Sequence, residues 1–406
     1  MDDASQPNAA DNAPSGAYDD PFERYTYKST LIERLRGSGG SLQVGRVKVT
    51  TARSFGFCWG VDRAVAMVQD AIAQYPGRNI WLLDQIIHNP RVNSDFKALG
   101  VRFLRGPFAD EQLELDTALG ADDVVVVPAF SAMVEDTERL AAIGCTVVDT
   151  TCPWVIKPHK RTLTYVRDGF TTVIHGLVDH EETRASASLI ASKGGRYLVV
   201  ADRRQAEWVC DVIRGDLDGA EMMERLPDGA VSVDFDPARD LALVGTINQT
   251  TMLASETREI ERMLKAAMAE RFGEGDVGEH FRELNTICRA TQDNQDAVAA
   301  MVAGDALDLM VVVGGYDSSN TRNLTRVGEG HFPSYHVDGP GAIAADEIRH
   351  RDPDSGEFTS TSAWLPEGPV TIGFTAGAST PDALLGETIT RVLEMAGAPV
   401  DVALAP

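Results

Sequence analysis

The chain has few cysteines and no long apolar run. Its 406 residues include 5 cysteines, and no two of them form a Cys-x-x-Cys pair. An odd number of widely spaced cysteines argues against a disulfide framework, and the missing pairs argue against a closed four-ligand zinc site. No segment approaches the roughly 20 apolar residues that a membrane-spanning helix needs. We therefore expect neither a set of structural disulfides nor association with a membrane.

Positive charge is also scarce. The chain carries 37 Lys and Arg residues against 61 Asp and Glu residues, which gives a formal net charge of -24. Proteins that bind nucleic acids need clustered Lys and Arg for the phosphate backbone, so we expect no nucleic-acid partner. A small anionic substrate is still compatible with this composition, because a pocket can be locally positive. The first residues, Met1-Asp2-Asp3-Ala4, show neither a secretory nor a transit pattern, which predicts a cytoplasmic protein.

From about residue 45 onward, short apolar runs alternate with amphipathic segments. The strand-like runs lie at residues 79–87, 124–130, 146–148, 171–174, 197–200, 241–246, 309–315 and 370–374. The helical patterns lie at residues 61–74, 161–168, 257–269, 295–303 and 383–396. This alternation predicts an α/β fold with mostly parallel strands. Residues 1–44 form an N-terminal extension, in which we expect disorder over 1–20 and a short helix over 25–36 that packs on the body.

Three of the cysteines occupy the same place in a repeated pattern. Cys58, Cys152 and Cys288 each end a strand-like stretch and precede a helical one. Cys145 and Cys210 lack this setting, so we interpret them as structural. The repetition predicts three α/β domains, over residues 45–152, 153–284 and 285–400. Three converging thiolates would suit an iron–sulfur cluster with one iron left open as a Lewis acid, although spacing alone also allows inert thiols.

Each predicted domain has two further strand ends that carry small or polar residues. These are residues 88–89 and 128–131, residues 180–182 and 248–251, and residues 318–320 and 375–379. Ligands of open parallel sheets lie beyond the carboxyl ends of the strands, so three such domains facing one another would form one pocket. Ser318, Ser319 and Asn320 precede a predicted helix and suit an anion, although Ser and Asn are also common N-caps. Because residues 248–251 and 375–379 also place small or polar residues between a strand and a helix, the pattern favours a phosphate-bearing ligand.

Two histidines and one glutamate at these strand ends are further candidates. His88 and His180 are placed to contact a phosphate or a hydroxyl. Glu182 is the best candidate for a proton donor, because a carboxyl that is shut away from water beside a diphosphate has a raised pKa. The alternative for Glu182 is an ordinary solvent-facing carboxylate in the first turn of a helix.

Eight short stretches resemble, in the same order, the 4-hydroxy-3-methylbut-2-enyl diphosphate reductase family, also called the LytB family. They lie at residues 56–64, 88–89, 149–153, 180–182, 249–251, 287–291, 318–320 and 375–379. Together they span about residues 45–395. Any one of these stretches is a weak signal, but eight of them in the family's order are specific.

The resemblance implies a trefoil of three α/β domains, with small and mostly parallel sheets, around a central [4Fe–4S] cluster. Cys58, Cys152 and Cys288 match the three ligands of that cluster, which has one open iron. The residues that match the diphosphate-binding positions, or lie beside them, are His88, His180, Ser318, Ser319, Asn320 and Ser379. Thr250 matches a threonine near the substrate hydroxyl, and Glu182 matches the glutamate of the proton relay.

The activity implied by the resemblance is the reductive dehydroxylation of (E)-4-hydroxy-3-methylbut-2-enyl diphosphate. In the family the substrate loses its hydroxyl as water and yields isopentenyl and dimethylallyl diphosphate, which is the last step of the methylerythritol phosphate route. The resemblance also implies a ferredoxin or a flavodoxin as electron donor, and we expect a monomer. Lys157, Lys160 and Arg161 are candidates for a basic patch that an acidic donor would contact.

The sequence departs from the shorter bacterial form of the family at Phe130. That form has a histidine there which contacts the diphosphate, whereas Phe130 cannot donate a hydrogen bond. The substitution, the His175-Gly176 pair and the long N-terminal segment resemble the plant and cyanobacterial branch. Two rival hypotheses remain at this point. One is another three-cysteine iron–sulfur enzyme, such as a quinolinate-synthase-like dehydratase, and the other is a non-catalytic metal-binding protein.

Overall fold

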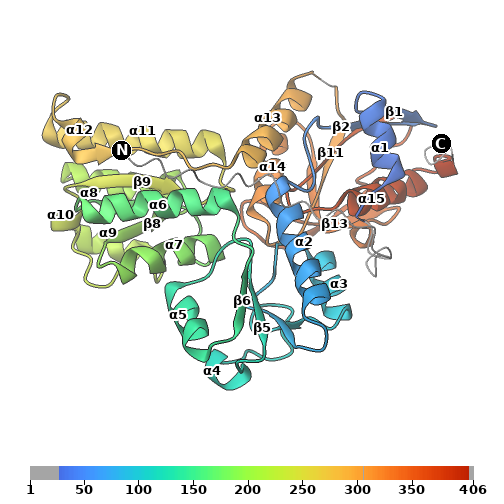
Figure 1. Cartoon of the computed structure of the whole chain (residues 1–406). Coiled ribbons are helices and arrows are strands. Elements are labelled where there is room, and N and C mark those ends of the chain that lie inside the picture. Colours follow the sequence, from blue (N-terminus) through green and yellow to red (C-terminus); the bar gives the residue numbers. More distant parts are fainter. Residues whose placement is uncertain (1–26, 305, 402–406) are drawn as a thin grey trace, which may run out of the picture.

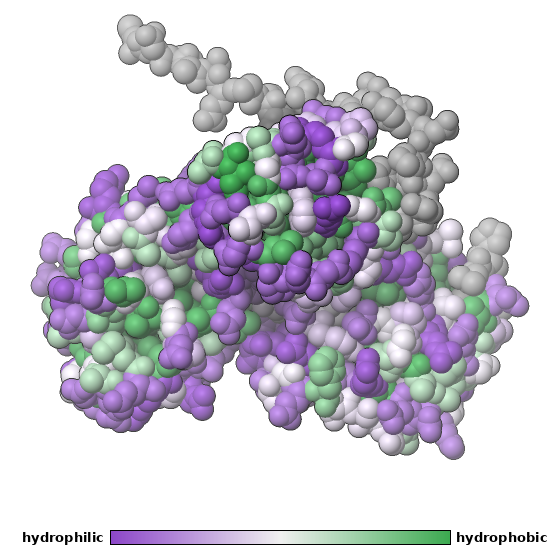
Figure 2. All heavy atoms as spheres, turned by 90° about the horizontal axis from the view of Figure 1, so that it is seen from below, coloured by the Kyte–Doolittle hydropathy of each residue, from purple (hydrophilic) through white to green (hydrophobic). Residues whose placement is uncertain are grey.

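Three β-sheets, each accompanied by helices, form three lobes around a common centre in the computed structural model (Figure 1). The structure describes residues 27–304 and 306–401. Within this part of the chain the sheets are small and mostly parallel, which confirms the predicted α/β trefoil. The predicted disorder of residues 1–20 lies outside the described residues. Figure 2 shows a largely hydrophilic surface with a recess between two of the lobes.

The first lobe contains a four-stranded parallel sheet with the order β4-β3-β5-β6. Its strands are β3 (Ile80–Leu82), β4 (Arg102–Phe103), β5 (Val124–Val127) and β6 (Thr146–Asp149). Its helices are α2 (Trp59–Gln74), α3 (Pro90–Ala98), α4 (Leu115–Ala118) and α5 (Val134–Ile143). All residues of β3 and β5 are buried, as expected for parallel strands covered on both faces.

The second lobe also contains a four-stranded parallel sheet, with the order β10-β9-β7-β8. Its strands are β7 (Thr171–His175), β8 (Tyr197–Val200), β9 (Val244–Asn248) and β10 (Phe281–Arg282). Its helices are α6 (Pro153–Arg167), α7 (Glu181–Ser192), α8 (Arg203–Arg214), α9 (Gly219–Arg225), α10 (Pro237–Asp240), α11 (Ala254–Phe272) and α12 (Val277–His280). Cys210 lies buried in the core of this lobe, in keeping with the structural role expected for it.

The third lobe contains a seven-stranded sheet with the order β1-β2-β15-β11-β12-β13-β14. The four strands from β2 to β12 are parallel, whereas β1 and the hairpin of β13 and β14 are antiparallel to their neighbours. The strands are β1 (Ser41–Val44), β2 (Val47–Thr51), β11 (Leu309–Val313), β12 (Ser334–Val337), β13 (Glu347–Arg351), β14 (Phe358–Ser362) and β15 (Val370–Ala376). The helices are α1 (Thr30–Gly37), α13 (Arg289–Gly304), α14 (Ser319–Glu329), the 3₁₀-helix η2 (Pro340–Ala342) and α15 (Asp382–Met395).

All three sheets share one arrangement of four parallel strands. The orders β4-β3-β5-β6, β8-β7-β9-β10 and β12-β11-β15-β2 are the same path through the sheet, except that β2 comes from the N-terminal side of the chain. The predicted first domain begins at residue 45, but β2 pairs with β15 and so lies in the sheet of the third lobe. The three domain ranges otherwise stay a prediction. Each of Cys58, Cys152 and Cys288 follows the fourth strand of one sheet.

The helix expected over residues 25–36 is present as α1, over Thr30–Gly37. Ser29 caps it by accepting a hydrogen bond from the N–H of Ile32, and its apolar face is buried in the core of the third lobe. Arg36 also pairs with Asp382 at the start of α15, with Nη2 and Oδ1 2.9 Å apart. The part of the predicted helix before residue 27 lies outside the described residues.

Candidate active site

A cavity of about 80 Å³ lies where the three lobes meet. Its walls come from the loops that follow the first and third strands of each four-strand unit, on either side of the point where the strand order reverses, and from the segments with the three cysteines that follow the fourth strands. That point is where open α/β sheets bind ligands. The predicted site residues that line it are Cys58, His88, Cys152, Glu182, Thr250, Cys288, Ser318, Ser319, Asn320 and Ser379. His180 lines an adjoining cavity and contacts His88. The chemical roles of these residues stay predictions.

The three cysteines reach the cavity from the starts of three helices. Cys58 and Cys152 are the N-cap residues of α2 and α6, and Cys288 directly precedes α13. In Figure 1 these three helices lead away from the centre of the molecule. Gly60 allows two of the thiols to approach, because a Cβ on Gly60 would lie 2.7 Å from Sγ of Cys152 and 3.8 Å from Sγ of Cys58.

The chemistry around these thiols suits a soft metal centre. All three are free, and burial raises their pKa values, that of Cys288 to about 11. Backbone N–H groups at the helix starts oppose this effect, and the N–H of Thr291 donates to Sγ of Cys288 at 3.4 Å. Such donors and the positive ends of three helix dipoles stabilise negative charge on sulfur. The residues present therefore fit a group held by three thiolates.

Glu182 is bound to Thr250 through both of its oxygens. Oε1 accepts the backbone N–H of Thr250 at 2.8 Å, and Oε2 accepts its hydroxyl at 2.9 Å. Glu182 is 3% exposed, so it is not the solvent-facing carboxylate of the alternative hypothesis. Burial raises the pKa of Glu182 to about 7, although the two bonds from Thr250 lower it. Near neutral pH this carboxyl can therefore hold a proton and release it into the cavity.

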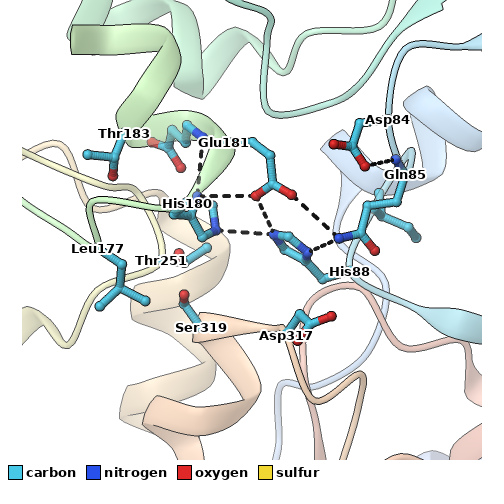
Figure 3. A network of polar contacts seen from close by, with 12 residues as sticks. Asp84, Gln85, His88, Leu177, His180, Glu181, Thr183, Thr251, Asp317 and Ser319 are labelled. Carbon is cyan, nitrogen blue, oxygen red and sulfur yellow. Dashed lines mark hydrogen bonds and ion pairs between the residues drawn. The ribbon is translucent and has the colours of Figure 1, made fainter. Parts of the chain in front are cut away.

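His88, His180 and Glu181 form a compact group beside the cavity (Figure 3). Nε2 of His88 lies 3.2 Å from Nε2 of His180 and 3.4 Å from Oε2 of Glu181. Burial lowers the pKa of both imidazoles, although Glu181 and Asp317 oppose this at His88. Both histidines are therefore neutral hydrogen-bonding groups near pH 7.

The tautomer of His180 decides what this group can bind. One ligand atom from each of His88, His180 and Glu181 lies within 4.8 Å of the others, which is compact enough for a metal ion. However, Nδ1 of His180 accepts the N–H of Glu182 at 3.2 Å, so in the neutral ring Nε2 carries the proton. A protonated Nε2 cannot coordinate a cation but can donate to an anion. Nε2 of His180 is therefore a hydrogen-bond donor in this group and not a ligand for a cation.

Phe130 packs against the same histidines. Its ring stacks on His88 with centroids 4.2 Å apart, and meets His180 edge-on at 5.6 Å. Phe130 donates no hydrogen bond, as expected from the sequence, and instead forms part of the apolar wall that buries both imidazoles. This packing contributes to the desolvation that keeps them neutral.

Serine and asparagine side chains form the remaining polar wall. Ser318 is the N-cap of α14, where its hydroxyl accepts the N–H of Thr321, so the capping role and a site role coexist. Oδ1 of Asn320 accepts the N–H of Ala378 at 2.9 Å. The Ser379 hydroxyl donates to the carbonyl of His88 at 3.2 Å. These neutral groups at a helix N-terminus form a suitable anion site.

Two further residues that support the site, Thr291 and Gln249, lie inside the stretches that resemble the family, but the sequence alone predicts no role for them. The Thr291 hydroxyl lies 3.1 Å from Sγ of Cys288 and 3.4 Å from Nδ2 of Asn320. Gln249 donates to the hydroxyls of Thr251 and Ser319, and so joins the second lobe to the third. The spacing Cys-x-x-Thr at a helix start could have indicated Thr291, because it is the usual distance of an N-cap contact. Nothing in the local sequence indicates the partners of Gln249.

Comparisons with known proteins show similarity over most of the chain. A family model described as LytB protein matches residues 49–393. The 4-hydroxy-3-methylbut-2-enyl diphosphate reductase of Gloeobacter violaceus is 43% identical over 374 residues, which cover 91% of this chain and 88% of that protein. The protein of the same name from Synechococcus sp. (strain RCC307) is 42% identical over 373 residues, with 92% and 90% covered.

Solved structures show the same fold. The E-1-hydroxy-2-methyl-but-2-enyl-4-diphosphate reductase from Plasmodium falciparum superposes with a TM-score of 0.62 at 18% identity, covering 85% of this chain and 87% of that one. A structure of (E)-4-hydroxy-3-methyl-but-2-enyl diphosphate reductase gives a TM-score of 0.50 at 23% identity, covering 87% and 100%. In the described part of the chain, no helix is long and apolar enough to cross a membrane.

Proposed function

This chain belongs to the LytB protein family, and from that premise we propose that it reduces 4-hydroxy-3-methylbut-2-enyl diphosphate to isopentenyl and dimethylallyl diphosphate. The reaction breaks the C–O bond of the allylic hydroxyl, consumes two electrons and two protons, and releases water. It is the terminal step of the non-mevalonate route. The observation that carries the proposal is one cavity lined by three free thiols, a protonatable carboxyl and a set of anion-binding loops.

We propose that the neutral polar wall holds the diphosphate. Ser318, Ser319, Asn320 and Ser379 offer hydroxyl and amide donors, and α14 presents its N-terminal N–H groups. His180 adds the Nε2–H that its contact with Glu182 fixes. The binding energy of this remote group would orient the allylic end of the substrate toward Glu182 and the thiols.

Glu182 and Thr250 would handle protons at the reacting end. The carboxyl of Glu182 holds a proton near neutral pH and is tied to a hydroxyl that faces the same cavity. A substrate hydroxyl bound beside Thr250 would lie within reach of this pair. Glu182 would then supply a proton to the departing oxygen, which makes water the leaving group.

We propose that Cys58, Cys152 and Cys288 hold one [4Fe–4S] cluster. The support is chemical, because the three buried thiols are free and receive N–H donors from helix starts. When bound, such a cluster supplies electrons, and its iron without a protein ligand supplies a Lewis acid. Closed zinc sites use four ligands, and the described residues around the cavity provide three thiols and no Cys-x-x-Cys pair.

Electrons would enter from the outer side of the thiols. Trp59 and Trp154, which are 64% and 40% exposed, each follow a proposed ligand, and Lys157 lies over the ring of Trp154. Exposed aromatic residues with cations beside them are typical of protein interfaces. We propose that a ferredoxin or a flavodoxin docks here on a monomeric, cytoplasmic enzyme.

The test is anaerobic purification followed by absorption spectroscopy and turnover of the diphosphate substrate with dithionite and methyl viologen. We expect a brown protein whose Glu182→Gln variant keeps its visible absorption but loses about 100-fold or more in kcat. Glu261→Gln is the matched control, because burial also raises the pKa of Glu261 to about 7 but this residue lies outside the cavity.

The possible outcomes separate the rival hypotheses. A coloured wild-type protein without reductase activity would contradict the proposal and favour the dehydratase. A protein that stays colourless after cluster reconstitution would favour a non-catalytic metal-binding protein. Equal losses in the Glu182 and Glu261 variants would refute the specific role of Glu182.

A further inference from the structure

A second, larger cavity adjoins the central one. It has a volume of about 510 Å³ and shares His88, Ser318 and Ser319 with the central cavity. Figure 3 shows the imidazoles of His88 and His180 above Ser319 and Asp317, and His88 and Ser319 line both cavities. The outer cavity therefore lies directly beside the proposed diphosphate loops. Two arginines, Arg322 and Arg351, line it as well.

Arg322 is positioned by the same helix start as the diphosphate loop. It lies in the first turn of α14, and its N–H bonds to the carbonyl of Ser318. Its guanidinium has no hydrogen bond or ion pair with any residue that the structure describes, and its Nε is buried without a partner. A buried N–H group of a cation without an acceptor is costly, so this side chain is arranged for a ligand.

Two further guanidinium groups lie near Arg322 but have partners of their own. Arg326 is 3.2 Å from Glu256 and 3.3 Å from Asp354. Arg351 is 3.5 Å from Asp317 and donates from Nε to the carbonyl of Gly356 at 2.7 Å. Burial lowers the pKa of Arg322, and repulsion from these two cations lowers it further, although Glu256 and Asp354 oppose this shift. Of the three guanidinium groups, Arg322 is therefore the one without a direct ion pair among the described residues.

The acidic residues of the outer cavity do not neutralise Arg322. Asp317 pairs with Arg351, Glu181 contacts His88, and Asp179 is exposed at the rim. None of the three forms an ion pair with Arg322 within the described residues. Arg322 is thus a cation without an ion pair among the described residues, in a chain whose formal net charge is -24.

The central cavity, where the proposed diphosphate loops lie, needs a positive charge nearby. Its donors are serine hydroxyls, an asparagine amide and two neutral imidazoles, and none of these attracts an anion from solution over a long distance. We propose that Arg322, supported by Arg351, forms an outer anion subsite that captures the diphosphate group of the incoming substrate and passes it to the inner loops. This inference rests on the proposed function and adds a residue that controls substrate capture.

The test compares Arg322→Gln and Arg322→Lys with wild type in the viologen-driven assay. We expect Arg322→Gln to lower kcat/KM about tenfold at low ionic strength, with most of the loss in KM. The difference should shrink in about 1 M salt, where the Debye length is about 3 Å. Arg322→Lys keeps the charge and should recover most of kcat/KM. Arg262→Gln is the control, because it makes the same charge change at a 74% exposed side chain on α11.

A stability measurement separates capture from a structural role. Removing Arg322 relieves repulsion and an unpaired N–H, so the thermal midpoint of Arg322→Gln should not fall. A lower midpoint together with a loss of kcat that salt does not change would overturn the inference, and so would an unchanged kcat/KM in active enzyme. If wild type fails to reduce the substrate, the proposed function fails. Binding of inorganic pyrophosphate then tests the contribution of Arg322 without turnover, with weaker binding in Arg322→Gln expected and equal affinity contradicting the inference.

Discussion

At the scale of single residues, burial is the main influence on the protonation of the side chains at the centre of the molecule. Burial raises the pKa of Glu182 and of the three thiols, and the same burial lowers the pKa of His88 and His180. The imidazoles and the thiols therefore favour their neutral forms near pH 7, and Glu182 is partly protonated there. The central cavity therefore offers hydrogen-bond donors and helix N-termini to a bound diphosphate, and none of the described residues that line it is a Lys or an Arg.

The sequence indicated most of these residues by their places at strand ends, and the resemblance to the family, not the pattern alone, favoured a site role over inert thiols or an ordinary first-turn carboxylate. It could not indicate that both oxygens of Glu182 bind Thr250, a residue 68 positions away. It also did not single out Arg322, whose importance depends on which cations lie across the cavity. Contacts between distant segments follow from tertiary structure and leave no local pattern.

The first prediction at this scale concerns pH. Glu182 holds its proton below its folded-state pKa of about 7 and loses it above that value. If it donates a proton, kcat/KM should be constant on the acidic side of this value and fall as pH rises through it. The measurement is the pH profile of viologen-driven turnover between pH 5.5 and 9 (roughly the range around a group near 7). A rate that rises across this range would contradict the assignment of Glu182 as the acid.

At the scale of helices and strands, the predicted runs and the observed elements agree in place but differ at their ends. The helix predicted over residues 161–168 begins at Pro153, and Pro158 lies inside it. Proline in a helix interior removes one hydrogen bond, so the first half of α6 gives a poor helical signal although packing maintains it. The strand predicted over 241–246 is β9 over Val244–Asn248, because the chain first completes a turn after α10.

Pairing between strands was the least predictable feature. The residues of β2 fall inside the range predicted for the first domain, residues 45–152. However, β2 pairs with β15, which lies more than 300 residues later. The local pattern of apolar residues marks a strand but does not select its neighbour. The common four-strand path of the three sheets explains the choice, because the third sheet lacks a fourth strand of its own.

The short distance between Gly60, at the start of α2, and Cys152, the N-cap of α6, leads to a prediction about Gly60. A Cβ at this position would lie 2.7 Å from Sγ of Cys152, so Gly60→Ala must push one proposed ligand away from its place. We expect the variant to fold but to retain less than half of the iron and acid-labile sulfide of wild type. Far-ultraviolet circular dichroism and iron analysis check this. Gly278→Ala is the control, since a Cβ there meets no atom within 4 Å. Full iron content in Gly60→Ala would contradict the proposed ligand geometry.

At the scale of the whole molecule, the site depends on all three lobes together. Each sheet contributes one cysteine after its fourth strand and two polar loops at the edge where the strand order reverses. The fourth strand of the third sheet is β2, so the N-terminal part of the chain completes the sheet that the C-terminal part forms. The cavity is lined by residues of all three lobes, so motifs spread over about residues 45–395 meet in one place.

The whole-molecule charge also bears on how electrons arrive. With a formal net charge of -24, the chain repels an acidic ferredoxin at long range, so docking requires local contacts. Trp59 is our proposed candidate for such a contact, because it is 64% exposed and directly follows Cys58, yet it does not line the central cavity. Exposed aromatic side chains often dominate the energy of such interfaces.

The last prediction therefore separates docking from chemistry. We expect Trp59→Ala to lower the ferredoxin-driven rate about tenfold at subsaturating ferredoxin, because truncating an aromatic anchor costs about 1 kcal/mol or more of binding energy. The viologen-driven rate bypasses docking and should change much less. Val233→Ala removes an 84% exposed apolar side chain from the second lobe and serves as the control. Equal losses with both donors would place Trp59 in support of the thiol site, and no loss with ferredoxin would move the docking surface elsewhere. Since Trp59 and Cys58 are neighbours at the start of α2, a loss confined to ferredoxin would also define the shortest route for electrons from the surface to the cavity.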